Sequence, residues 1–192
     1  MYEYRTLEQT SPVILYETFR TAYEGVPSIG GKNFRTFALA FSLIAHRYPD
    51  LRVVCTREAF NCEEMVLFRR LGIAERMQSI AADEPMLARL YTNARLFVFP
   101  SRYEGFGMPI LEAMAYGCPC ALSDSSCFPE IAGDAATYFP SDDAEAMADA
   151  IDALLTCEEL RSTLRQRGRE RVKQFTWERS AKQHLNLYLS LA

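Results

Sequence analysis

Residues 96–117 read L-F-V-F-P-S-R-Y-E-G-F-G-M-P-I-L-E-A-M-A-Y-G, and this stretch decides the fold class. It begins with a continuous apolar run, Leu96–Phe99, which is typical of a strand that is covered on both faces of a sheet. A loop with two glycines follows, and Pro109 then fits the first turn of a helix that runs to about Tyr116. Gly117 fits the C-terminal end of that helix. The stretch therefore predicts a strand, a loop and a helix, the repeating unit of a parallel sheet.

The same alternation continues on both sides of this stretch. Short apolar runs predict further strands at residues 13–16, 51–55, 77–80, 120–123 and 136–139. Apolar periodicity and capping residues predict helices that start after Asn33, over Cys62–Leu71, after Asp83 and, in two or three pieces, from Asp142 onward. This pattern predicts an α/β fold with a doubly wound, Rossmann-like parallel sheet, in a single domain over residues 1–192. In the last helix, Trp177 is expected to pack against the core.

Composition argues against several classes of function. The chain is 49% hydrophobic and 24% charged, which is ordinary for a globular domain. The formal net charge is −4 and Lys and Arg form no basic run, so nucleic acid is not expected as a partner. The six cysteines include no C-x-x-C pair and the two histidines stand alone, so no metal site is expected.

The start of the chain and its cysteines suggest a compartment. Residues 1–12 are polar and lack the apolar stretch of a signal peptide, and no apolar run in the sequence approaches membrane-spanning length. Several cysteines lie in apolar runs, where reduced, buried thiols are expected. We therefore expect a cytoplasmic protein, and the sequence gives no support for membrane association.

The loop before the predicted helix at Pro109 has the features of an anion site. Its glycines allow backbone amides to approach a ligand, and the N-terminus of the following helix favours a negative charge such as a diphosphate. Glu104 precedes the glycines and Glu112 lies about one turn into the helix. Two carboxylates beside a diphosphate suit hydrogen bonds from sugar hydroxyls. Taken alone, Glu104 is better explained as a solvated loop residue and Glu112 as a first-turn partner of the helix dipole.

A resemblance to a known family favours the ligand-binding interpretation. The spacing of Glu104 and Glu112 resembles the E-x7-E signature of retaining family-four glycosyltransferases. Further segments resemble that family in the same order along the chain: Gly31-Lys32-Asn33-Phe34, residues 83–94, Pro129-Glu130-Ile131-Ala132-Gly133-Asp134-Ala135-Ala136 and Phe175-Thr176-Trp177-Glu178. The resemblance implies the C-terminal, nucleotide-sugar-binding half of a two-domain enzyme of the GT-B fold.

The resemblance also implies roles for individual residues. Glu112 would hold the ribose hydroxyls of the nucleotide, and Glu104 would face the donor sugar. Lys32 would neutralise the charge on the diphosphate leaving group, which is electrostatic catalysis without a metal or another cofactor. The nucleobase would be held near Ile80, largely by the backbone. The implied catalytic residues are Glu104 and Lys32, and the implied donor-binding residues are Glu112, Gly105, Phe106, Gly107, Met108, Pro109, Ile80 and Arg20.

The sequence departs from the family at the arginine that usually precedes the lysine. The family places this arginine at or just after a Val-Gly pair that ends the first strand. The pair is absent here, and Arg20 falls close to the expected place. A solvated arginine after a strand explains Arg20 equally well. Arg35 lies beyond Lys32 and is out of register.

The second departure concerns the other half of the enzyme. Only residues 1–12 precede the first predicted strand, so the N-terminal, acceptor-binding domain of the family is not expected in this chain. We therefore expect the donor-binding domain of a retaining hexosyltransferase, with a nucleoside-diphosphate sugar as its substrate and with little activity in isolation. The alternative is a non-catalytic nucleotide-sugar-binding or regulatory module of the same fold. A sugar-nucleotide epimerase of the GT-B fold is a third interpretation, although its pattern around the glutamates differs.

Overall fold

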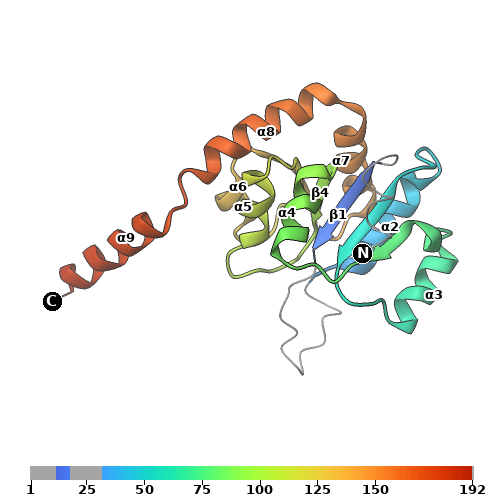
Figure 1. Ribbon diagram of the computed structural model, residues 1–192, viewed down its shortest axis with the longest axis horizontal. Coiled ribbons are helices and arrows are strands. Elements are labelled where there is room, and N and C mark those ends of the chain that lie inside the picture. The colour runs from blue at the N-terminus through green and yellow to red at the C-terminus, as the bar shows by residue number, and fades with distance from the viewer. Residues whose placement is uncertain (1–11, 18–31, 192) are drawn as a thin grey trace.

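The computed structural model describes residues 12–17 and 32–191, and in this part of the chain six strands form one parallel sheet (Figure 1). The strand order is β3-β2-β1-β4-β5-β6, so the direction of winding reverses between β1 and β4. The strands are β1 Val13–Glu17, β2 Arg52–Thr56, β3 Met77–Ser79, β4 Leu96–Phe99, β5 Cys120–Ser123 and β6 Ala136–Phe139. This confirms the predicted doubly wound, Rossmann-like α/β fold.

Helices connect the strands and cover the sheet (Figure 1). They are α2 Phe34–Ala45, α3 Cys62–Arg70, the 3-10 helix η1 Ala74–Arg76, α4 Glu84–Asn93, α5 Met108–Ala115, α6 Phe128–Ala132, α7 Ala144–Thr156, α8 Glu158–Val172 and α9 Trp177–Ser190. Gly72 and Gly117, which were predicted to end helices, both have positive φ. Asp83 caps α4 by accepting a hydrogen bond from the Met86 amide. The predicted helix after Asn33 ends earlier than expected, at Ala45.

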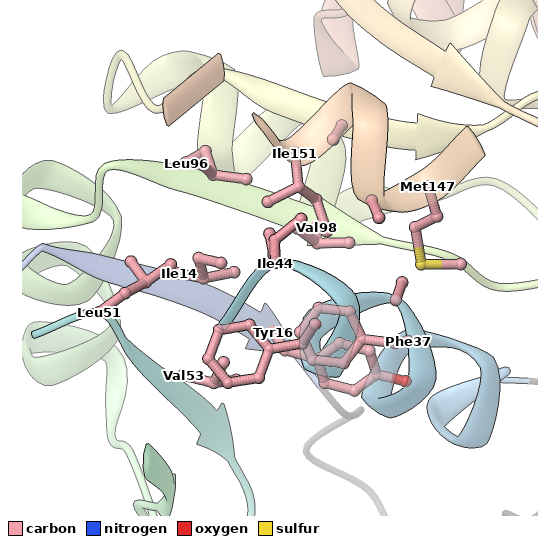
Figure 2. Close-up of a cluster of buried hydrophobic side chains, with 14 of the residues drawn as sticks. Ile14, Tyr16, Phe37, Ile44, Leu51, Val53, Leu96, Val98, Met147 and Ile151 are labelled. Atoms are coloured by element: carbon pink, nitrogen blue, oxygen red, sulfur yellow. The ribbon is translucent and has the colours of Figure 1, made fainter. Parts of the chain in front are cut away.

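Alternate residues of the strands face two separate apolar layers, as the pleat of a strand requires. Ile14 of β1 contributes to a layer formed with α2 and α7 (Figure 2), and its neighbour Leu15 contributes to the opposite layer. In the first layer, Figure 2 labels Ile14, Tyr16, Phe37, Ile44, Leu51, Val53, Leu96, Val98, Met147 and Ile151. The second layer includes Leu87, Tyr91, Phe97, Ile110, Met114 and Phe128 from β4, α4, α5 and α6. Both faces of the central strands are thus buried, which explains their continuous apolar sequence.

Helix α9 departs from the expectation for the last helix. None of its residues is buried, and Trp177 is 81% exposed, so the prediction that Trp177 packs against the core is wrong. Figure 1 shows α9 extending away from the body of the domain. The aromatic residue that does reach the domain is Phe175, whose ring centroid lies 6.1 Å from that of Phe106. The chain therefore leaves the domain surface just before α9 begins.

Three further findings concern the cysteines, clusters of possible metal ligands and membrane-spanning helices. All six cysteines are free, and burial raises the pKa of Cys55 and Cys118 well above the usual range. Within residues 12–17 and 32–191, no three His, Cys, Asp or Glu side chains come together in a way that could hold a metal ion. Of the helices described, none combines the length and apolar character needed to cross a membrane.

Candidate functional site

The candidate site residues lie where parallel strands end. Lys32 precedes α2, the Glu104 loop follows β4, and Ile80 follows β3. Because all strands of the sheet are parallel, the segments that follow them meet at one edge. The winding reverses between β1 and β4, and ligands of doubly wound sheets bind at such a reversal. The fold therefore brings the predicted residues to the edge at which a ligand is expected.

The loop after β4 ends in a tight turn into α5. Gly107 is the N-cap of α5 and has φ of 99°, a conformation that L side chains rarely adopt. A Cβ at Gly107 would lie 3.1 Å from Ile110 Cδ1 and 3.4 Å from the Phe128 ring, so the turn packs closely on its neighbours. Pro109 lies in the first turn of α5, as predicted. In this first turn Pro109 has no backbone N–H, and the Ile110 N–H donates to the Gly107 carbonyl at 2.9 Å. The Met108 N–H at the start of α5 is therefore the donor that an anion can use.

The structure brings Lys32 and Glu104 into direct contact. The Lys32 Nζ lies 2.5 Å from Glu104 Oε1, and the two side chains are only 19% and 12% exposed. The Lys32 ammonium also lies 5.4 Å from the centre of the Phe99 ring. The Tyr16 hydroxyl donates to the Lys32 carbonyl at 2.7 Å, which fixes the backbone of Lys32 against the end of β1. Burial raises the pKa of Tyr16 well above its usual value, so this donor stays protonated.

Asn33 follows Lys32 and has a role that the sequence did not indicate. It occupies the N-cap position of α2, as predicted, but its side chain does not cap the helix. Its amide nitrogen instead donates to the Pro100 carbonyl at 3.1 Å and to the Ser141 carbonyl at 2.5 Å. Asn33 is 4% exposed and adopts the left-handed conformation, with φ of 57°. It therefore joins the start of α2 to the segments that follow β4 and β6.

Glu112 lies in α5, one turn after Gly107. Its side chain is half-buried, and among the described residues its carboxylate has neither a hydrogen-bond partner nor an ion-pair partner. A partly buried carboxylate usually accepts hydrogen bonds. The site thus contains one carboxylate paired with a lysine, at Glu104, and one that lacks a protein partner in the described part of the chain, at Glu112.

The remaining predicted residues make no hydrogen bond or ion pair with the Lys32–Glu104 pair that the structure records, or they fall outside the described residues. Gly105, Phe106 and Met108 lie on the exposed surface of the loop and of the start of α5. The Ile80 amide donates to the Cys55 carbonyl at 2.9 Å, so this N–H is not available to a nucleobase. Arg20 lies outside the described residues, and its place relative to Lys32 remains a prediction.

Two residues that contact the loop were missed by the sequence analysis. The Ser126 hydroxyl and the Cys127 thiol both bond to the backbone of the Glu104 loop from the segment after β5. The Arg102 guanidinium, in the same loop, pairs with the Asp142 carboxylate at 2.6 Å. These contacts join segments 21 to 40 positions apart. The only sequence signal at Ser126 was its place in a polar run between a strand and Pro129.

Comparison with known proteins identifies the family. Residues 31–171 match the family described as Glycosyl transferases group 1. The "O-antigen chain mannosyltransferase B" of Escherichia coli is 42% identical over 102 residues, which are 53% of this chain and 27% of that protein. This chain therefore spans about a quarter of the length of that relative.

Solved structures agree with the family match. Sucrose-phosphate synthase from Thermosynechococcus elongatus superposes with a TM-score of 0.70 and 26% identity, over 97% of this chain and 47% of that one. A C-terminal domain of a glycosyl transferase group 1 family protein from Francisella tularensis shares the fold, with a TM-score of 0.68 and 24% identity over 85% of each chain. The resemblance to the C-terminal half of a GT-B enzyme is confirmed, and this chain belongs to the glycosyl transferases group 1 family.

Proposed function

We propose that this chain is the donor-binding domain of a retaining glycosyltransferase, which transfers a hexose from a nucleoside-diphosphate sugar to an acceptor. The observation that carries the proposal is the contact between Lys32 and Glu104 beside the N-terminus of α5, at the reversal of strand order. A cation and a helix N-terminus together suit a diphosphate, and the adjacent carboxylates suit sugar hydroxyls.

The proposed roles follow from charge and position. The diphosphate would lie against the first turn of α5, and the Lys32 ammonium would stabilise the negative charge that develops as the sugar leaves. Glu104 would accept hydrogen bonds from the donor sugar, and Glu112 would accept them from the ribose. Because Lys32 already pairs with Glu104, an arriving diphosphate would share the ammonium with that carboxylate rather than meet an isolated positive charge. No metal ion takes part in this scheme.

The relatives support mannose as the first donor sugar to test. The similar protein from E. coli is named as a mannosyltransferase, and so is a relative from Mycolicibacterium hassiacum that is 32% identical over 151 residues. The residues that select the acceptor are proposed to lie in a second, N-terminal domain of the enzyme, because the chain spans less than half of these relatives. Transfer would then require both domains.

Calorimetric titration tests donor binding directly. The purified chain is titrated with UDP, GDP and ADP, with magnesium and with EDTA, and then with a matching sugar nucleotide such as GDP-mannose. Saturable binding of one nucleoside diphosphate, unchanged by EDTA, is expected. Inorganic pyrophosphate is the control, because it carries the charge without the ribose and base and should bind more weakly. A folded chain that binds none of these nucleotides would contradict the proposed donor site in this domain.

A further inference from the structure

One hydroxyl group, that of Ser126, contacts both backbone polar groups of Glu104. It accepts a hydrogen bond from the Glu104 amide at 3.2 Å and donates one to the Glu104 carbonyl at 2.8 Å. The two residues lie 22 positions apart, in the segments that follow β5 and β4. Because both groups of one residue are bound by one side chain, the backbone of Glu104 is held at a fixed distance and orientation.

The next two residues hold the following part of the same loop. The Cys127 thiol donates to the Phe106 carbonyl at 2.9 Å and lies 3.6 Å from the Glu104 carbonyl. The ring of Phe128 is buried against the place where a Gly107 Cβ would stand. Three consecutive residues, 126–128, therefore contact Glu104, Phe106 and Gly107 in order.

The backbone of Ser126 supports a specific role for its hydroxyl. Ser126 has φ of 57°, in the left-handed region that glycine adopts without strain and serine does not. Strained backbone conformations persist where the surrounding structure holds them, and they concentrate at functional sites. A glycine at position 126 would satisfy the turn but would leave both polar groups of Glu104 without this partner.

We infer that Ser126 and Cys127 are positioning residues, which direct the Glu104 carboxylate toward Lys32 and the donor sugar. The segment between β4 and α5 contains no helix or strand, so its backbone is held by side chains rather than by a ladder of hydrogen bonds. The direction in which the Glu104 side chain leaves the backbone depends on the backbone angles that Ser126 fixes. Its role toward the sugar rests on the proposed function, whereas the contacts with the loop do not.

The substitution Ser126→Gly removes the hydroxyl and leaves a residue that adopts the left-handed turn without strain. Glycine removes the hydrogen bonds but relieves the left-handed strain, so the melting temperature should fall less than in Ser126→Ala, which keeps the strain. The affinity for the sugar nucleotide, measured relative to that for its nucleoside diphosphate, should fall about three- to tenfold, the size expected for one or two neutral hydrogen bonds. Ser126→Ala should give the same loss of relative affinity together with a lower melting temperature. An unchanged relative affinity in Ser126→Gly overturns the inference, whatever happens to stability.

Cysteine 127 offers a rescue experiment. Cys127→Ala removes the donor to the Phe106 carbonyl and should lower the same relative affinity. Cys127→Ser keeps a donor of similar size and should restore most of it. If both substitutions have equal effects, a hydrogen bond from position 127 does not hold the loop, and the part of the inference that concerns Cys127 is wrong.

Hydrogen exchange distinguishes failure of this inference from failure of the proposed function. If the unaltered chain binds none of the nucleotides, the proposed donor site fails, and the exchange rate of the Glu104 amide in nuclear magnetic resonance spectra decides the positioning role. That rate should rise in Ser126→Gly, whereas the Gly133 amide, bonded to the Pro129 carbonyl at 3.0 Å, should keep its rate. An unchanged Glu104 rate would overturn the inference on structural grounds alone.

Discussion

The Lys32 ammonium lies 2.5 Å from the Glu104 carboxylate, although 72 positions separate these residues in the sequence. The contact joins the start of α2 to the loop after β4, across the point where the winding of the sheet reverses. Each side chain is largely shielded from water, so the pair is screened less than an exposed ion pair would be. A ligand that reaches the Lys32 ammonium would therefore meet the Glu104 carboxylate beside it.

Replacement of Glu104 tests which part of the donor this pair contacts. Glu104→Ala should not lower the affinity for nucleoside diphosphate, because the Lys32 ammonium is then no longer shared with a carboxylate. It should lower the affinity for the sugar nucleotide, relative to that for the nucleoside diphosphate, about tenfold or more, as expected for hydrogen bonds to a charged group. Calorimetry with both ligands measures the difference. Asp142→Ala is the matched control, because it removes the exposed carboxylate that pairs with Arg102 in the same loop. An equal loss for both ligands in Glu104→Ala would place the carboxylate beside the diphosphate instead.

Replacement of Glu112 should have the opposite pattern. Glu112→Ala removes the acceptor proposed for the ribose hydroxyls, so nucleoside diphosphate affinity should fall about tenfold or more. Binding of inorganic pyrophosphate, which has no ribose, should not change. The control is Glu130→Ala, which removes an exposed glutamate from the first turn of α6. If Glu112→Ala binds the nucleotide as well as the unaltered chain does, the proposed position of the ribose is wrong.

Two glycines of the same loop should respond very differently to alanine. At Gly107 the backbone has φ of 99° and a Cβ would lie 3.1 Å from Ile110 Cδ1, so Gly107→Ala should lower the free energy of unfolding by about 1–3 kcal/mol. At Gly105 a Cβ would meet no atom within 4 Å, and Gly105→Ala should change stability by less than about 0.5 kcal/mol. Urea denaturation measures both values. Equal stabilities would show that the turn at Gly107 adapts to a side chain.

The fold was predictable because its signals are local. Each strand is a short apolar run, and helix ends carry residues whose conformational preferences act within one turn, such as Asp83 and Gly117. The two glutamates of the candidate site could be predicted for the same reason, since Glu104 and Glu112 lie in one strand-loop-helix unit. Lys32 was assigned from the family resemblance, and its contact with Glu104 appears only in the folded chain.

The features that the sequence did not predict depend on partners far along the chain. The side chain of Asn33 leaves its own helix because two carbonyl groups, at Pro100 and Ser141, are within reach in the folded domain. Ser126 likewise bonds to a loop 22 positions away. Trp177 has apolar character and helical neighbours, which favour burial, but no surface of the described domain covers it. Periodicity predicts that a face is apolar without specifying what covers it.

Acid should weaken the fold partly through Glu158. Hydrogen bonds from the Arg161 and Arg165 guanidinium groups hold the pKa of Glu158 at about 2, below its ordinary value of 4.5. Because this pKa is depressed in the folded state, the stabilisation is fully present above pH 4.5 and is lost as the pH falls from 4.5 toward 2. In Glu158→Gln the free energy of unfolding should therefore decrease less between pH 4.5 and pH 2 than it does in the unaltered chain, as measured by urea denaturation at each pH. Glu159→Gln, at the neighbouring position, is the control for the change of charge at the start of α8.

Helix α9 should contribute little to the stability of this chain. None of its residues is buried, and five of its large apolar side chains, together with that of Leu191 beyond its end, are exposed, so its removal uncovers no core. A chain that ends at Thr176 should melt within about 2 °C of the full chain, because the loss of an exposed segment changes the free energy of unfolding by only a few tenths of a kcal/mol. Phe175→Ala is the contrasting variant and should lower the melting temperature, since that ring packs against Phe106 and the Arg171 guanidinium.

An isolated helix of the length of α9 is marginal in water. Circular dichroism should therefore show that truncation removes less helical signal than the fourteen residues of α9 would give if fully formed. A large drop in melting temperature on truncation would instead mean that α9 folds back onto the domain.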